Sequence, residues 1–194
     1  SSPLPDGGFV STYTDITRRS KAEAAMRQRD AVVSALNAAA SAILASNDWT
    51  GPVETMLATI GEVTGVSRVY FAHDYLAENG RYKQQELFQW RRPGVSSFWD
   101  NPKLRTMTVK DDAFQDWRDR RRRGETVQAI VSQLDDSKRG WLELQDMKAL
   151  VRVPVFVSGQ MWGTIGFDDC FEERVWSEAE VEALKAAAAL TGVA

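Results

Sequence analysis

Cysteine and histidine are nearly absent from this sequence. Cys170 is the single cysteine and His73 the single histidine among 194 residues. An internal disulfide or a cysteine-rich metal site is therefore excluded, and one thiol is typical of a protein from a reducing cytoplasm. A nucleophilic serine or cysteine would also need a base within reach, and a lone imidazole leaves few options. The composition thus argues against an enzyme.

Long apolar runs and strong net charge are also missing. No run approaches the roughly 18 apolar residues of a membrane-spanning helix, and the start "SSPLPDGGF" lacks the parts of a signal peptide. A net charge of -3 gives no strong field toward nucleic acid or an anionic membrane, so we expect contact with neither. The sequence also lacks an initiator methionine. We therefore expect a cytoplasmic piece of a longer polypeptide, whose other parts could lie in a membrane.

Apolar residues, by contrast, are abundant. Hydrophobic residues make up 43% of the sequence and include seven tryptophans, which is enough apolar surface to offset the entropy of folding. The length fits one globular domain with an appendage.

The first 46 residues change from a strand pattern to a helix pattern. The stretch "FVSTYTDI" alternates like a β-strand but has no partner strand beside it, and Thr17 can cap a helix that runs over 18–46. A four-three spacing within this helix forms the seam of a two-stranded coiled coil, made of Ala22, Met26, Arg29, Val33, Leu36, Ala40 and Ile43. The seam predicts a parallel homodimer. The alternative is an ordinary amphipathic helix that packs on its own domain.

The rest of the sequence alternates helices with paired strands. Helices are predicted over 53–65, 110–124, 136–147 and 176–192, and strands over 66–75, 83–90, 125–133, 148–157 and 161–170. The last helix begins with a capping box, in which Ser177 is the N-cap and Glu180 follows three residues later. Antiparallel hairpins with helices at both ends of the chain predict an α+β fold.

Two stretches resemble known families. The stretch "ALVRVPVFVSGQMWGTIGFDDC", with the helix that follows "RVWSEAEVEAL", resembles the last strands and terminal helix of a GAF domain. The stretch "DGGFVSTYTDITRRSKAE" resembles the end of a PAS domain, with its Asp15-Ile16-Thr17 motif and connector helix. The resemblance divides the chain into a PAS-like strand over 1–17, a connector helix over 18–46 that merges into the first GAF helix, and a GAF-like domain over 30–194.

Both families are common in bacterial signalling proteins such as sensor histidine kinases and diguanylate cyclases. The resemblance implies a GAF-like antiparallel sheet flanked by terminal helices, in a module between a PAS domain and an output domain. GAF domains that attach a bilin carry a Cys-His pair and an Asp-Ile-Pro motif. Those that reduce methionine sulfoxide carry several cysteines, and those that bind cyclic nucleotides carry an Asn-Lys-Phe-Asp-Glu signature. None of these occurs here, so we expect no covalent bilin and leave the ligand open.

Two polar stretches raise other kinds of site. Asp168 and Cys170 share one strand face while Asp169 points to the other, so too few groups converge for a metal. A structural role for His73 is favoured over haem or metal ligation. The arginine run over 118–124 is surrounded by acidic residues, which favours a solvated helix face over a nucleic-acid site.

Five tryptophans lie in the segments that form the sheet and the pocket cover of a GAF domain. These are Trp90, Trp99, Trp117, Trp141 and Trp162. They either line an apolar ligand cavity, with Arg68, Tyr70 or Arg152 as polar anchors, or fill the core. Core filling is favoured because tryptophan is mostly buried in a domain of this size.

Three hypotheses about function follow. The first is a sensory module that binds a small molecule and relays its state through dimeric end helices to an output domain. The second is a ligand-free dimerisation scaffold, and an enzyme ranks last. A cavity with convergent polar groups would favour sensing, whereas an interior filled by tryptophan would favour the scaffold.

Overall fold

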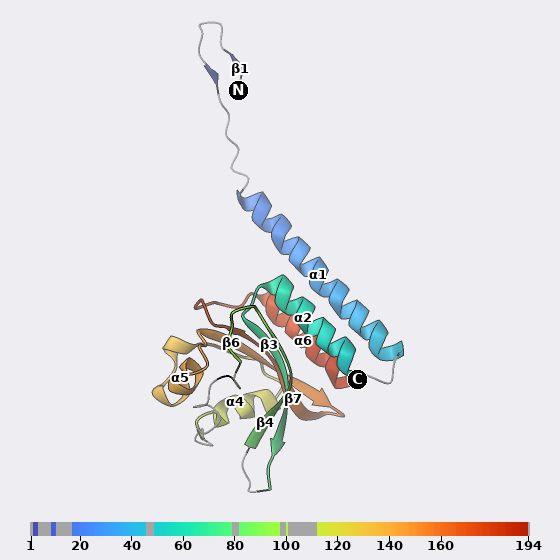
Figure 1. The fold of residues 1–194 in the computed structure, drawn as a ribbon, viewed down its shortest axis with the longest axis vertical. Coiled ribbons are helices and arrows are strands. Elements are labelled where there is room, and N and C mark those ends of the chain that lie inside the picture. Colours follow the sequence, from blue (N-terminus) through green and yellow to red (C-terminus); the bar gives the residue numbers. More distant parts are fainter. Residues whose placement is uncertain are drawn as a thin grey trace.

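The chain folds around a five-stranded antiparallel sheet with helices on both faces (Figure 1). The computed structural model describes residues 2–3, 9–10, 17–45, 49–78, 82–97, 100 and 112–193. The elements are β1 Ser2–Pro3, β2 Phe9–Val10, α1 Thr17–Ala45, α2 Thr50–Thr64, β3 Arg68–Leu76, β4 Tyr82–Arg91, α4 Gln115–Arg122, β5 Val127–Ile130, the 3-10 turn η2 Val131–Gln133, α5 Asp136–Glu143, β6 Ala149–Val157, β7 Gln160–Asp169 and α6 Glu178–Val193.

The sheet has the strand order β4-β3-β7-β6-β5. Helices α1, α2 and α6 lie on one face of the sheet, and the short helices α4 and α5 lie on the other (Figure 1). The hairpins β3–β4 and β6–β7 form as the sequence predicts, and β3 and β7 join them in the centre, from Arg68 opposite Asp168 to His73 opposite Gly163. The predicted α+β class and the antiparallel sheet with helices at both ends of the chain are therefore confirmed.

The main core lies between the sheet and the helices. Alternate residues on each central strand face the helices, among them Phe71 on β3 and Phe167 on β7. Leu57 of α2 and Leu184 of α6 are both fully buried against them. Helix α1 packs on the outside of α2 and α6, so the helices form two layers over one face of the sheet (Figure 1).

Both inner helices have the ends that the sequence predicts. Helix α2 stops at Gly65, whose φ of 66° lies in the left-handed region that glycine adopts without strain. Before α6, the Ser177 backbone N–H donates to a Glu180 carboxylate oxygen at 2.9 Å, and the Glu180 N–H donates to Ser177 Oγ at 3.3 Å. The predicted capping box is confirmed.

Helix α1 divides the predicted seam between two faces. Leu36 and Ile43 pack on the core of their own domain, beside the buried residues Val32 and Ala39. The other seam members point elsewhere: Met26 is 66% and Val33 47% exposed, Ala22 and Arg29 are exposed, and Ala40 is half-buried. The seam is thus partly an intramolecular face.

The N-terminal strand differs from its prediction in one respect. Phe9 and Val10 pair with Pro3 and Ser2 of the same chain, whereas the sequence offered no partner. Residues 4–8, which connect the two paired segments, lie outside the described residues. The rest of the predicted strand, 11–16, lies outside the described residues.

Candidate functional site

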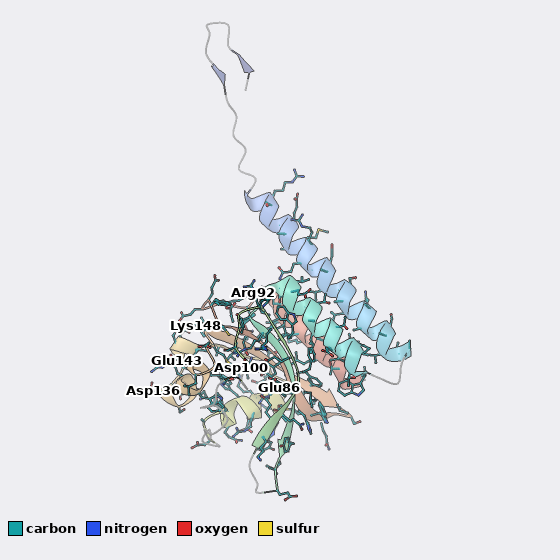
Figure 2. The ribbon with its side chains drawn as sticks, in the orientation of Figure 1. Glu86, Arg92, Asp100, Asp136, Glu143 and Lys148 are labelled. Atoms are coloured by element: carbon teal, nitrogen blue, oxygen red, sulfur yellow. The ribbon has the colours of Figure 1, made fainter. Side chains whose placement is uncertain are left out.

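The sheet face opposite α2 and α6 carries charged and polar side chains. Strand alternation places those of β3, β6 and β7 there, since residues two apart on a strand point the same way, and α4 adds Arg121 from above this face. We call this set the charged face: Arg68, Tyr70, Asp74, Arg121, Arg152, Thr164 and Asp168. No charged side chain of the set is more than 12% exposed. By contrast, charged residues such as Asp136, Glu143 and Lys148 lie on the outside of the molecule (Figure 2). Burial of so many charges marks this face as the candidate site.

Asp168 lies between two arginines. Arg68 Nε donates to Asp168 Oδ2 at 3.1 Å, and Arg152 Nη2 lies 2.6 Å from Asp168 Oδ1. The Arg68 and Asp168 side chains are each 2% exposed. Burial lowers the pKa of Arg152, but Asp168 and the other acidic groups near it together raise the pKa by more, so the guanidinium stays charged. Two predicted anchors, Arg68 and Arg152, therefore meet at the carboxylate of Asp168. From the sequence alone, this residue is considered only as a metal ligand, and its pairing with the arginines is not predicted.

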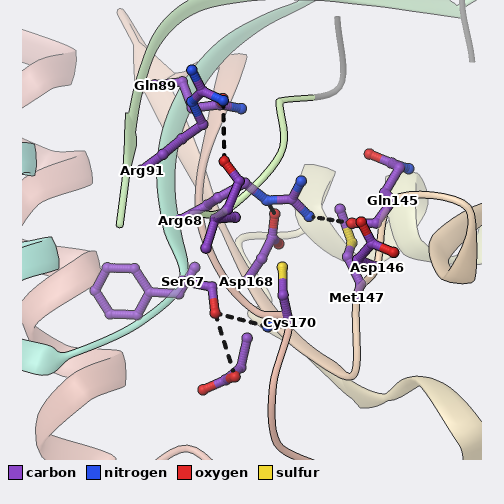
Figure 3. Close-up of polar contacts among 12 residues, drawn as sticks. Ser67, Arg68, Gln89, Arg91, Gln145, Asp146, Met147, Asp168 and Cys170 are labelled. Atoms are coloured by element: carbon purple, nitrogen blue, oxygen red, sulfur yellow. Dashed lines mark hydrogen bonds and ion pairs between the residues drawn. The ribbon is translucent and has the colours of Figure 1, made fainter. Parts of the chain in front are cut away.

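Arg68 also holds two distant segments over the sheet. Its Nη1 donates to the Ser96 carbonyl at 3.2 Å, and its Nη2 donates to the Gln145 carbonyl at 2.9 Å. Figure 3 shows Arg68 between Asp168 and the Gln145 segment. We call residues 95–97 and 145–147 the cover segments. A single guanidinium thus joins both cover segments to the central strands.

Tyr70 lies at the centre of the charged face. The Arg152 guanidinium stacks over its ring at 4.7 Å. Gly166 makes this stack possible, because a Cβ there would lie 2.8 Å from both Arg152 Nη1 and the Tyr70 ring. Burial raises the pKa of the Tyr70 hydroxyl above its usual value, so the phenol stays neutral.

A second ion pair corrects the prediction of a solvated helix face for Arg121, whereas Arg122 and Arg123 of the run 118–124 are exposed. Arg121 is buried, and its Nη1 donates to Asp74 Oδ2 at 2.8 Å and to the Thr164 hydroxyl. Thr164 Oγ1 in turn donates to Asp74 Oδ2 at 2.5 Å. The spacing from Trp117 to Arg121 is one helical turn, so Arg121 shares the buried face of that tryptophan. This spacing was the available signal.

Behind Asp168, its neighbour Asp169 faces the helices. Arg174 Nη1 lies 3.5 Å from Asp169 Oδ2, and Arg174 Nη2 pairs with Glu180 of the α6 capping box. The same Nη2 donates to the carbonyl of Thr64, the last residue of α2, at 3.4 Å. We call Arg68, Asp168, Asp169, Arg174 and Glu180 the cross-sheet path. It links the cover segments on one face with the ends of α2 and α6 on the other.

The tryptophans do not line one cavity. Trp117 and Trp141 fill a second, smaller core beneath α4 and α5, while Trp90 and Trp162 pack on the main core at the helix side. Trp162 has no opposite residue on β6, because the register shifts beside it, and its ring stacks on His73 at 4.2 Å. Trp99 lies outside the described residues. Of the four that are described, Trp117 is buried, and Trp90, Trp141 and Trp162 are half-buried against the two cores.

A surface groove lies away from the charged face. It has a volume of about 530 Å³ between α2 and the edge strand β4, and Glu54, Glu62, Phe88 and Trp90 line it.

Within the described ranges, no group of three or more His, Cys, Asp or Glu could hold a metal ion. Burial raises the pKa of Cys170 and so lowers its thiolate fraction. Every helix described is too short or too polar to span a membrane.

Comparison with known proteins places these features in context. The GAF domain family profile matches residues 52–194. The methanogenesis regulatory histidine kinase FilI of Methanothrix harundinacea is 29% identical over 185 residues, which is 95% of this chain and 21% of that protein. An uncharacterized protein of Azorhizobium caulinodans is 29% identical over 139 residues, 70% of this chain and 19% of its own. The chain therefore spans about a fifth of each of these relatives.

Solved structures share the fold. The phycocyanobilin-bound GAF domain from a cyanobacterial phytochrome superposes with a TM-score of 0.67 at 17% identity, covering 84% of this chain and 92% of that one. The GAF3 domain of Slr1393 from Synechocystis sp. PCC6803 gives a TM-score of 0.61 at 17% identity, covering 74% and 90%. At such identities the likeness concerns the fold alone.

Proposed function

This chain belongs to the GAF domain family, and from that premise we propose that it is a sensory module that binds a small molecule on its charged face. The bound state is relayed through the end helices to an output domain. The relative FilI is a histidine kinase, so a kinase is the output domain that we propose for the longer polypeptide. The domain itself performs no catalysis.

The observation that carries this proposal is the cross-sheet path. Arg68 holds the carbonyls of both cover segments, and Asp168 holds Arg68. The next residue, Asp169, reaches through Arg174 to the start of α6 and the end of α2. A ligand that moves a cover segment would therefore favour one packing of these helix ends over another.

A homodimer through α1 is the second part of the proposal. The helix carries two apolar stripes, about 100° apart around its axis. One stripe packs on its own domain, and the other leaves Met26, Val33 and Leu44 exposed, the last at 89%. A second copy of the chain would cover this outer stripe. Helix α1 would then also connect to a PAS domain, whose last strand we propose in residues 1–17.

Native mass spectrometry of the purified chain tests both parts. We expect a bound small molecule and a dimer. The substitutions Met26→Lys and Val33→Lys together should give a monomer, whereas Ser34→Lys, on another face of α1, should leave the dimer intact. A chain that carries no small molecule contradicts the sensor. A wild-type chain that is monomeric contradicts the dimer relay. So does a dimer that stays intact when Met26→Lys and Val33→Lys are combined.

A ligand-free scaffold is the alternative function. One observation favours it: Arg152 and Tyr70 already fill the space above Gly166. An enzyme stays the last hypothesis, and substitution of Cys170 and His73 without loss of any detectable activity would dispose of it.

A further inference from the structure

The charged face carries more positive than negative charge. Three guanidinium groups, of Arg68, Arg121 and Arg152, face two carboxylates, of Asp74 and Asp168, which leaves an excess of one positive charge among the described residues. On the helix side of the sheet the balance is opposite, because Arg174 there faces two carboxylates. A buried charge without a counter-ion is costly, so the charged face favours an added anion.

Two of these arginines still have hydrogen-bond donors to offer. Arg121 contacts Asp74 and Thr164 through Nη1 alone, and within the described ranges its Nε and Nη2 donate to no protein group. Arg152 uses Nη1 and Nη2, and its Nε likewise has no protein acceptor there. Arg68 differs, because all three of its nitrogens are engaged. The donors for an anion therefore belong to Arg121 and Arg152.

The same two arginines lie on either side of one small stretch of sheet. Arg121 contacts Thr164, and Arg152 lies over Gly166, two residues along the same face of β7. Positions two apart on a strand are separated by about 7 Å, so the two arginines contact neighbouring positions of β7, and one carboxylate or phosphate group can accept hydrogen bonds from two guanidinium groups. Both arginines act electrostatically on Tyr70, so the three side chains form one environment. The residue opposite Thr164 on β3 is Ala72, so no large side chain projects from β3 at this position.

We propose that the ligand of the charged face is a small organic anion, and that its carboxylate or phosphate group pairs with Arg121 and Arg152. The inference rests on the proposed sensory function and specifies its ligand class. The anion neutralises the excess charge and accepts charge-assisted hydrogen bonds from Arg121 and Arg152 donors that have no acceptor among the described residues.

Thermal unfolding of the whole chain, titrated with inorganic phosphate and with succinate at constant ionic strength, tests this inference. We expect at least one of the two anions to raise Tm in a saturable way, while chloride does not. Arg121→Gln should weaken that binding about tenfold or more. The matched control Arg123→Gln, an exposed arginine that follows the same helix, should leave it unchanged.

A variant with the opposite expected effect excludes simple damage to the fold. Asp74→Asn removes a carboxylate from the charged face and should tighten anion binding several-fold, which a merely destabilised protein would not do. Arg121→Lys serves if Arg121→Gln does not fold, because it keeps the charge beside Asp74 but loses the guanidinium donors. Failure of both anions to raise Tm overturns the inference, as does equal binding by wild type and the Arg121 variant.

The same preparation separates this inference from the proposed function. If native mass spectrometry finds a bound molecule that is uncharged or cationic, the anion is wrong while the sensor stands. If the anion binds and no change reaches α6 by hydrogen exchange, the relay is wrong while the ligand class stands.

Discussion

The two faces of the sheet bury their side chains in different ways, and neighbouring residues of β7 make the contrast. Phe167 points to the helices and is fully buried among apolar groups. Asp168, the next residue, points to the charged face and lies between two arginines. The helix side gains free energy by removing apolar surface from water. Buried ion pairs contribute little by comparison, because desolvation offsets their attraction. The helix side therefore supplies most of the stability of the fold. The buried charges of the charged face add little stability, so we attribute them to function.

Phe167→Ala should have the largest effect on stability. The side chain is fully buried between the sheet and Trp176, whose ring centroid lies 5.6 Å away. Its removal leaves a cavity and should lower the free energy of unfolding by about 4 kcal/mol. Chemical denaturation measures this loss. A loss below that of Asp168→Asn would contradict the division between the two faces.

Asp168→Asn should follow, at about 3 kcal/mol. The substitution leaves Arg68 and Arg152 buried without their shared carboxylate, and this uncompensated charge is the cause of the loss. The exposed Glu182→Gln, which removes a surface pair with Lys185, should change stability by less than about 0.5 kcal/mol. If Asp168→Asn lowered the free energy of unfolding no more than Glu182→Gln, Asp168 would not be paired with Arg68 and Arg152 as described.

Gly166→Ala tests the packing of the charged face. The added Cβ would meet Arg152 and Tyr70, so the cation-π stack must shift, at a cost of about 2 kcal/mol. Gly140→Ala is the matched control. Gly140 lies in α5 with nothing near its Cβ position, so alanine there should stabilise the fold by about 0.5–1 kcal/mol. A neutral Gly166→Ala would mean that the space above Gly166 is open.

Of the four destabilising substitutions, Ser177→Ala should have the smallest effect, a loss of about 1 kcal/mol, because it removes the N-cap side chain of α6. Ser34→Ala, in the exposed middle of α1, should instead give a gain of a few tenths of a kcal/mol. An unchanged stability for Ser177→Ala would indicate that Arg174 and the backbone N–H of residue 177 hold Glu180 in place without the Ser177 hydroxyl.

The sequence predicted the helix side better than the charged face. Strand periodicity, Gly65 and the Ser177–Glu180 box are local signals, and each was read correctly. The pairing of Arg68 with Asp168 joins residues 100 positions apart, and no local pattern reports such a contact. The prediction of a solvated face was wrong for Arg121, because several neighbouring arginines give no signal for which of them faces the sheet. Leu36 and Ile43 fit a dimer seam and an intramolecular face equally well, since both require the same periodicity.

Hydrogen exchange in Arg174→Gln tests the central claim, that the two faces are coupled through Asp168 and Asp169, most directly. The substituted side chain lies on the helix side, where it pairs with Asp169 and Glu180. If the cross-sheet path couples the faces, amide exchange should rise at the start of α6 and also in the cover segments 95–97 and 145–147 across the sheet. Faster exchange confined to the start of α6 and the end of α2, with unchanged cover segments, would contradict the account.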